Sequence, residues 1–241
     1  MKKLSMKTMS IGTRVSLIVV LMIAVITAVN VIIVMVSSNR IVTDMARSEA
    51  VLANNTFAKE MQNLQKEALM SAEIISHSRE VAEAILARDG TALRRALAGL
   101  NKDVDFITVC DAEGTVLARS HNDQTGDNVI NQKLFSSALH SGTGLSTIES
   151  SSKAELATSG SAVIRDSGGT IIGAVVCGHN LAKTQYVDEF KRLTHCETTI
   201  FAGDTRLSTT LVDERGNRAI GTKASQAVID IVMTQKKTAN E

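Results

Sequence analysis

The feature that most constrains this chain is an uninterrupted apolar run near its N-terminus. From Val15 to Val36, about 22 consecutive residues carry no charge, and only Ser16, Thr27 and Asn30 are polar. As a helix this run would rise about 33 Å, which is enough to cross a bilayer core of about 30 Å. The apolar region of a secretory signal peptide is only about 7–15 residues long. Residues 15–36 are therefore predicted to form an uncleaved transmembrane helix, which makes the lipid bilayer a partner of the chain.

The charges that flank this run predict its orientation. Residues 1–14 contain four basic side chains and no acidic one. Because cationic flanks stay on the cytoplasmic side, we expect residues 1–14 in the cytoplasm of a bacterium. The rest of the chain would then lie beyond the inner membrane, in the periplasm or outside the cell, as part of a single-pass protein. The net charge of +1 gives no indication of a general nucleic-acid binder.

Residues 37–101 are expected to form a stalk helix followed by shorter helices. From Ser37 to about Arg88 there is no Gly or Pro, and small or apolar residues recur at steps of three and four. That pattern is typical of a helix seam, with a break expected near residues 76–78. The seam could pack on the sheet of its own domain, or also against a sister subunit in a homodimer, and both alternatives stay open. Thr91 is expected to cap a further helix that ends at Leu100.

Residues 102–195 are expected to form an antiparallel sheet with short helices. A strand starting at Val104, a turn at Asp111–Gly114 and a return strand over Thr115–Ser120 predict a hairpin. A helix is expected from about Asn131 to His140, and a strand over Leu145–Ser150.

A second hairpin is expected around the turn Asp166–Gly169. Its first arm would open at Ser161, after a polar connection over Ser151–Gly160. Its second arm, Ile171–Gly178, is almost entirely apolar or small, which predicts a central strand buried on both faces. A helix over Ala182–His195 would close this domain.

Residues 196–241 are expected to start another module. Strands are predicted over Cys196–Phe201, Arg206–Val212 and Arg218–Thr222, and a last helix over Ala227–Met233. The fold class is therefore α+β, with an N-terminal apolar helix, a long stalk helix and an antiparallel sheet.

This order of elements resembles that of periplasmic Cache-type sensor regions, which have a PAS-like fold, in bacterial methyl-accepting chemotaxis proteins. The resemblance covers most of residues 38–230 and is carried by Val109–His121, Gly126–Asp127, Gly173–Leu181, Thr199–Thr210 and Gly221–Lys223. It implies a receptor that binds a small ligand outside the cell and passes a conformational change through the membrane. In the family, the segment from about Cys196 opens a second, membrane-proximal module, of which only the start would be present here.

The resemblance also implies ligand-binding residues. In sensors related to the citrate and C4-dicarboxylate receptors, the strand after the first turn ends on a ligand-binding His, and His121 stands at that position with Arg119 two residues before it. Alternate strand residues share a face, so both would point to one side. Where those sensors carry basic residues, this chain has Thr158, Ser159 and Ser161, which argues against a di- or tricarboxylate. Hydroxyls suit a single carboxylate, an amino acid or a polar neutral ligand.

Other chemistry finds little support in the sequence. Cys110, Cys177 and Cys196 are widely spaced and odd in number, which favours structural thiols over a disulfide or metal site. Asp127 is expected to cap a helix entry. No nucleophile elbow, phosphate loop or metalloprotease motif is present. We therefore expect no enzyme, no metal site and no cofactor.

Three classes of function stay open. The ligand-binding part of a chemotaxis receptor fits best, but the same input region also serves histidine kinases and cyclic-dinucleotide enzymes. A membrane-tethered binding or scaffold protein without signalling output is the alternative from another class. Because no return span or output segment is present, the chain is expected to be a fragment or a truncated reading frame.

Overall fold

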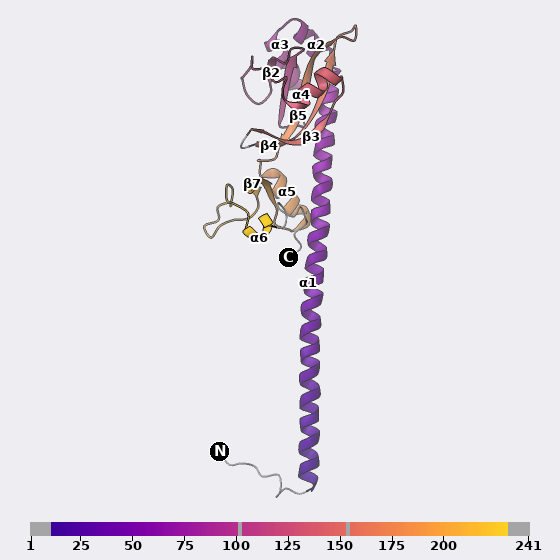
Figure 1. Ribbon diagram of the computed structural model, residues 1–241, viewed down its shortest axis with the longest axis vertical. Helices are drawn as coiled ribbons and strands as arrows, with labels where there is room; N and C mark the ends of the chain where they lie inside the picture. The colour runs from indigo at the N-terminus through magenta and orange to yellow at the C-terminus, as the bar shows by residue number, and fades with distance from the viewer. Residues whose placement is uncertain (1–10, 101–102, 153–154, 231–241) are drawn as a thin grey trace. The chain divides into compact units, whose positions relative to one another are not determined.

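The computed structural model describes residues 11–100, 103–152 and 155–230 (Figure 1). The described residues divide into two units, one within residues 11–52 and one within residues 53–230. The predicted α+β class is confirmed, since a long N-terminal helix precedes an antiparallel sheet.

Helix α1 runs from Ile11 to Ser76 and contains the apolar run. It has a mean hydropathy of 3.1 over its most apolar window, and it is long and apolar enough to cross a membrane. Its polar side chains bond to their own helix: Thr27 Oγ1 donates to the Ile23 carbonyl at 2.8 Å, and Asn30 Nδ2 donates to the Ile26 carbonyl at 2.9 Å. These bonds lower the cost of placing the two polar groups in an apolar medium.

The second unit is organised around a five-stranded antiparallel sheet. Its strands are β1 (Phe106–Asp111), β2 (Val116–Arg119), β3 (Ser146–Ser152), β4 (Glu155–Arg165) and β5 (Ile171–Asn180). The order β2-β1-β5-β4-β3 makes β5 the central strand, as its apolar sequence predicts.

The expected polar connection over Ser151–Gly160 is wrong. Strand β4 already begins at Glu155 and pairs with β3 and β5. The serine-rich sequence forms strand here because both of its neighbours supply backbone partners, so pairing outweighs weak strand propensity.

Helices cover both faces of this sheet. Helices α1, α2 (Arg79–Leu86) and α3 (Gly90–Leu100) pack on one face, with Ile107, Val175 and Cys177 in the shared core. We call this side of the sheet the α1 face. Helix α4 (Lys133–Ser136) and the π-helical turn η2 (Ser137–Ser141) pack on the other face, which we call the α4 face; its core residues are Cys110, Val116, Val129, Leu134, Phe135, Ala138, Ala174 and Val176.

The helix boundaries follow their caps. The predicted break near residues 76–78 is confirmed, because α1 ends at Ser76 and the Ser78 hydroxyl accepts from Val81 N at the start of α2. The cap expected at Thr91 is wrong: the Asp89 carboxylate accepts the N–H groups of Thr91 and Ala92, each at 3.0 Å. Asp is a stronger cap than Thr and lies one residue before the helix.

A third cluster joins α1 to the C-terminal part of the chain. Helix α5 (Gln185–Thr194) and the hairpin of β6 (Thr199–Ala202) and β7 (Thr205–Thr209) lie beside it, and Phe57 meets Phe190 edge-on at 5.0 Å. Only isolated bridges form at Arg218 and Lys223, so the strand expected over residues 218–222 is wrong. Helix α6 spans Gln226–Val228, and residues 231–233 of the expected last helix lie outside the described residues.

The cysteines agree with the structural interpretation. Cys110 and Cys177 are buried free thiols, while Cys196 is partly exposed. Burial raises the pKa of the Cys110 thiol to about 12 and raises that of Cys177 as well. Both thiols are therefore protonated and unreactive at neutral pH.

Candidate functional site

Strand register gathers polar side chains on the α4 face. Thr108 pairs with Arg119 on one side and with Val176 on the other. Val176 in turn pairs with Ser161. Because directly opposed residues of antiparallel strands share a face, Arg119 and Ser161 lie at the two ends of one row across four strands.

A second row runs parallel to the first. Gly178 pairs with Phe106 and with Ser159, and the His121 ring meets the Phe106 ring edge-on at 5.8 Å. This row is displaced by two residues along each strand, so it occupies the same face. The polar rows, as we call both together, thus bring together four of the predicted residues: Arg119, His121, Ser159 and Ser161.

The close packing of the second row depends on Gly178. A Cβ added there would lie 2.6 Å from Phe106 Cζ, 2.8 Å from Ser159 Oγ and 2.5 Å from the Thr158 carbonyl oxygen. Only glycine lets these groups lie against the strand. Phe106, Thr108 and Gly178 were not predicted as site residues; their pairing partners, rather than any motif, identify them.

Ser161 and Ser159 are buried. The Ser161 hydroxyl donates to the Leu145 carbonyl at 3.3 Å and accepts from Leu145 N at 3.2 Å. It therefore holds the start of β3 to β4 in this state.

Arg119 is engaged by the loop that follows β2. Its two terminal nitrogens each donate to a carboxylate oxygen of Asp127 at 2.7 Å, and one of them also donates to the Gln124 carbonyl. The Arg119 guanidinium lowers the pKa of the Asp127 carboxyl. Asp127 was expected to cap a helix entry, which is wrong: it pairs with Arg119 because both flank the same loop.

Breaking this pair is expected to loosen the loop more than the domain. Asp127→Asn removes the charge, and we expect a loss of about 0.5–1 kcal/mol, since the Asp127 side chain is 53 % exposed. The carboxylate has a lowered folded-state pKa, so its contribution is present above the unfolded pKa and is lost as pH falls through the folded pKa. Thermal melts of wild type and Asp127→Asn at pH 7 and at pH 3 measure both effects. A difference between the two proteins that stayed the same at both pH values would contradict the ion pair.

Thr158 does not join the polar rows. Its side chain points to the opposite side of β4 from that of Ser159, which is the α1 face. There Thr158 is fully buried, and it pairs in register with His179. Its hydroxyl finds no hydrogen-bond partner among the described residues.

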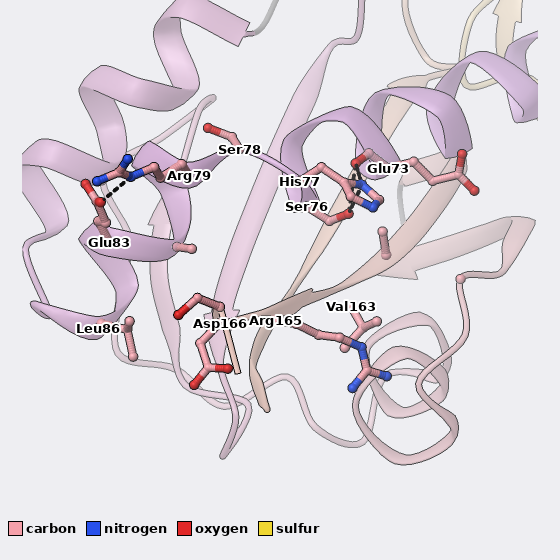
Figure 2. Close-up of a pocket in the computed structure, with 14 residues that line it drawn as sticks. Glu73, Ser76, His77, Ser78, Arg79, Glu83, Leu86, Val163, Arg165 and Asp166 are labelled. Carbon is pink, nitrogen blue, oxygen red and sulfur yellow. Dashed lines mark hydrogen bonds and ion pairs between the residues drawn. The ribbon is translucent and has the colours of Figure 1, made fainter. Parts of the chain in front are cut away.

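A separate pocket lies where α1 meets α2 (Figure 2). It has a volume of about 770 Å³ and is lined by Glu73, His77, Arg79, Arg165 and Asp166, among others. None of the predicted site residues lines it. In the sequence, only the predicted helix break near residues 76–78 indicates where this pocket lies.

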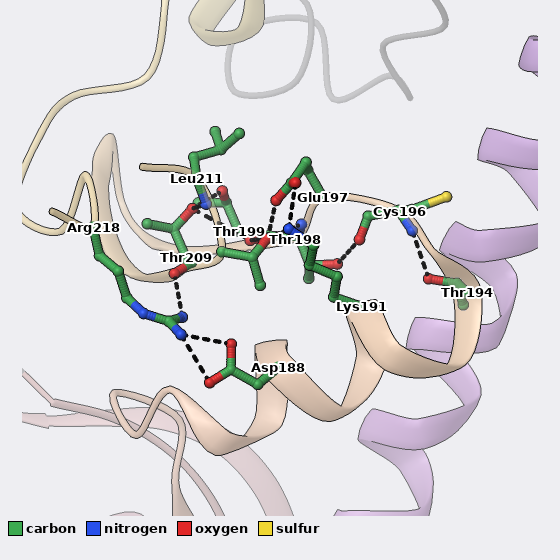
Figure 3. Close-up of polar contacts among 11 residues, drawn as sticks. Asp188, Lys191, Thr194, Cys196, Glu197, Thr198, Thr199, Thr209, Leu211 and Arg218 are labelled. Carbon is green, nitrogen blue, oxygen red and sulfur yellow. Dashed lines mark hydrogen bonds and ion pairs between the residues drawn. The ribbon is translucent and has the colours of Figure 1, made fainter. Parts of the chain in front are cut away.

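Ion pairs join helix α5 to residues before and after the β6–β7 hairpin (Figure 3). Arg218 donates to the Thr209 carbonyl at 2.8 Å and pairs with Asp188, while Lys191 pairs with Glu197. Hydrogen bonds from Lys191 and from Thr210 Oγ1 lower the pKa of Glu197. These contacts connect segments of the chain to one another.

The comparison with protein families identifies this C-terminal region. Residues 179–240, from the end of β5 through α5, β6 and β7, match the family model of the single Cache domain 3. The Cache resemblance expected from the sequence is thereby confirmed. No curated protein matches the chain with comparable significance.

Solved structures of sensor domains align with parts of this chain. The E. coli DcuS sensor domain is 21% identical, with a TM-score of 0.46 over 53% of this chain and 97% of that one. The Vibrio cholerae LuxQ periplasmic domain is 15% identical, with a TM-score of 0.48 over 75% and 86%. The ligand-binding domain of the Pseudomonas aeruginosa amino acid chemoreceptor PctC, solved with GABA, is 11% identical, with a TM-score of 0.44 over 77% and 82%.

Proposed function

Starting from the Cache-type identity of this chain, we propose that it senses a small polar or anionic ligand outside the cytoplasm and signals through helix α1. The observation that carries the proposal is that Arg119, His121, Ser159 and Ser161 share the α4 face. Helix α1 packs on the opposite face of the same sheet, so a change in the sheet reaches it directly.

The chemistry of the polar rows favours a ligand with one carboxylate or several hydroxyls. Two serine hydroxyls donate and accept, and the His121 ring adds a nitrogen donor or acceptor. Arg119 already holds Asp127 with both terminal nitrogens, so a ligand carboxylate would have to replace Asp127 there. This occupied guanidinium supports an amino acid or monocarboxylate over a ligand with two or three carboxylates.

Ligand entry would require movement of the loop over residues 120–128. Ser159 and Ser161 are buried, whereas residues 120–128 are exposed. The loop is held by the ion pairs Arg119–Asp127 and Arg94–Asp123. A ligand that exchanges with Asp127 would release the loop and favour a second packing of the sheet on α1. Only a difference in ligand affinity between the two packings can drive this change.

We further propose a non-catalytic input region of a bacterial inner-membrane receptor that acts as a homodimer. A chemotaxis output is the leading candidate, with histidine kinases and cyclic-dinucleotide enzymes as alternatives. A tethered binding protein without output would share the ligand site, so the DNA downstream of this reading frame separates these classes. A second span followed by a long heptad-rich helix identifies a chemoreceptor.

A thermal-shift screen of the full chain in detergent tests ligand binding. Amino acids, monocarboxylates, dicarboxylates, amines and purines would each be added to the protein. A ligand at about 100 times its dissociation constant stabilises the folded state by about 2.7 kcal/mol, which raises Tm by roughly 5–10 °C in a domain of this size. We expect one class to do so, and Arg119→Ala/His121→Ala to abolish the shift. An equal shift in the double variant would refute the site.

A further inference from the structure

The face of the sheet opposite the polar rows holds a buried histidine with an unusual environment. His179 is the penultimate residue of the central strand β5 and is 4 % exposed. Its Nδ1 lies 3.2 Å from Tyr186 Oη, and that hydroxyl donates to Asp105 Oδ2 at 2.6 Å. Since the Tyr186 proton is used on Asp105, the tyrosine oxygen acts as the acceptor and the histidine proton lies on Nδ1. Nε2 therefore carries a bare lone pair.

A carboxylate near this Nε2 could accept a hydrogen bond from it once the nitrogen is protonated. It has no hydrogen-bond partner within the described residues, and the nearest carboxylate, Glu67 Oε2 on α1, lies 3.8 Å away. The unpartnered Thr158 hydroxyl belongs to the residue directly opposite on β4. In the neutral state two acceptors, Nε2 and the Glu67 carboxylate, face each other without a proton between them. A buried ring nitrogen without a hydrogen-bond partner costs free energy, and at Nε2 proton uptake would supply the missing partner.

We propose that His179 is a proton-binding site through which the surrounding pH controls how helix α1 sits on the sheet. Proton uptake at Nε2 turns the lone pair into a charged N–H donor. The Glu67 carboxylate then changes from a facing acceptor to an ion-pair partner. Helix α1 and strand β5 are pulled together at this point. The device is independent of ligand binding and gives the domain a second input.

The charges around His179 determine where it titrates. Burial lowers its pKa, and Lys183, which lies just before α5, lowers it further. Asp105 and Asp103 ahead of β1, and Glu67 on α1, raise it. Burial is the largest of these effects, so His179 is neutral at pH 7 and takes up a proton only in acid. Because the folded-state pKa lies below the unfolded one, this group contributes stability above the unfolded pKa, and the contribution declines as pH falls.

Histidine NMR on the full chain in detergent tests the proposal. With ¹³C-labelled histidine, each ring is followed between pH 8 and pH 4.5, and hydrogen exchange of the α1 segment around Glu67 is measured over the same range. We expect His179 to titrate at lower pH than a free histidine, because burial lowers its pKa, and the α1 exchange to change with the His179 midpoint. Glu67→Gln is expected to lower that midpoint and to remove the α1 response, whereas His140→Gln leaves both unchanged.

Three outcomes would overturn the proposal. They are a His179 ring that stays neutral to pH 4.5, a His179 midpoint that does not lie below that of a free histidine, and an α1 exchange pattern that is independent of pH. His179→Gln should remove the α1 response as well. If that variant does not fold, Glu67→Gln still decides, because the Glu67 side chain is 55 % exposed and its replacement leaves the core intact.

Discussion

Replacing Gly160 with alanine is expected to destabilise the protein by about 1–3 kcal/mol or more. A Cβ at this position would lie 2.4 Å from both N and Cα of Leu69 and 2.7 Å from the carbonyl carbon of Ala68. All three are backbone atoms of helix α1, so no side-chain rotation relieves the overlap. Either the helix moves away from β4 or the strand bends. In a chain of this size the loss lowers Tm by roughly 2–10 °C.

Gly99→Ala is the matched control. Gly99 lies in helix α3, and a Cβ there would meet nothing within 4 Å. Alanine is favoured over glycine inside a helix by about 0.5–1 kcal/mol, so this variant should be neutral or slightly more stable. Thermal melts of the full chain in detergent compare the two. Equal behaviour of both variants would mean that α1 does not lie against β4 as closely as described.

In the proposed receptor, the contact at Gly160 would affect signalling as well as stability. Close packing against the backbone of α1 leaves little space for independent movement, so the sheet and the helix must shift together. Gly160→Ala is therefore expected to bias the packing of α1 on the sheet even where the protein stays folded. In the proposed receptor this bias would change the output without contact with the ligand.

Periodicity and turn chemistry predicted most of the fold. The apolar sequence of Ile171–Gly178 identified the central strand β5. The turn sequences Asp111–Gly114 and Asp166–Gly169 identified the hairpins β1–β2 and β4–β5. These features are local: an apolar strand must be covered on both faces, and a turn needs residues that tolerate its backbone angles. The helix break near residues 76–78 was identifiable because Ser78 is a good cap.

Contacts between distant segments were not predictable in the same way. Ser151–Gly160 has the composition of a loop, and only pairing with both neighbours makes most of it strand. The same error hid the alternation that separates Thr158 from Ser159. The Arg119–Asp127 pair depends on the path of the loop over residues 120–128, which no periodic pattern specifies. The sequence thus identified the polar residues, while strand register determined which of them share a face.

This alternation provides the sharpest test of the ligand site. Ser159→Ala is expected to weaken ligand binding about tenfold or more, because a hydrogen bond from a protein to a charged group contributes about 1.5–3 kcal/mol. Thr158→Val, one residue away on the other face, is expected to leave the dissociation constant unchanged. At pH 7.5, where His179 is neutral, it should also raise the stability, since it removes a buried hydroxyl without a partner.

Isothermal titration of the full chain with whichever ligand the screen identifies measures the two dissociation constants, and thermal melts measure the two stabilities. The two substituted residues are adjacent and buried, and their side chains lie on opposite faces of the sheet. A general loosening of β4 would therefore affect both variants alike. Loss of binding in Ser159→Ala alone assigns the ligand to the α4 face. Loss in Thr158→Val alone would move the ligand beneath α1, beside His179, and would refute the polar rows as the binding site.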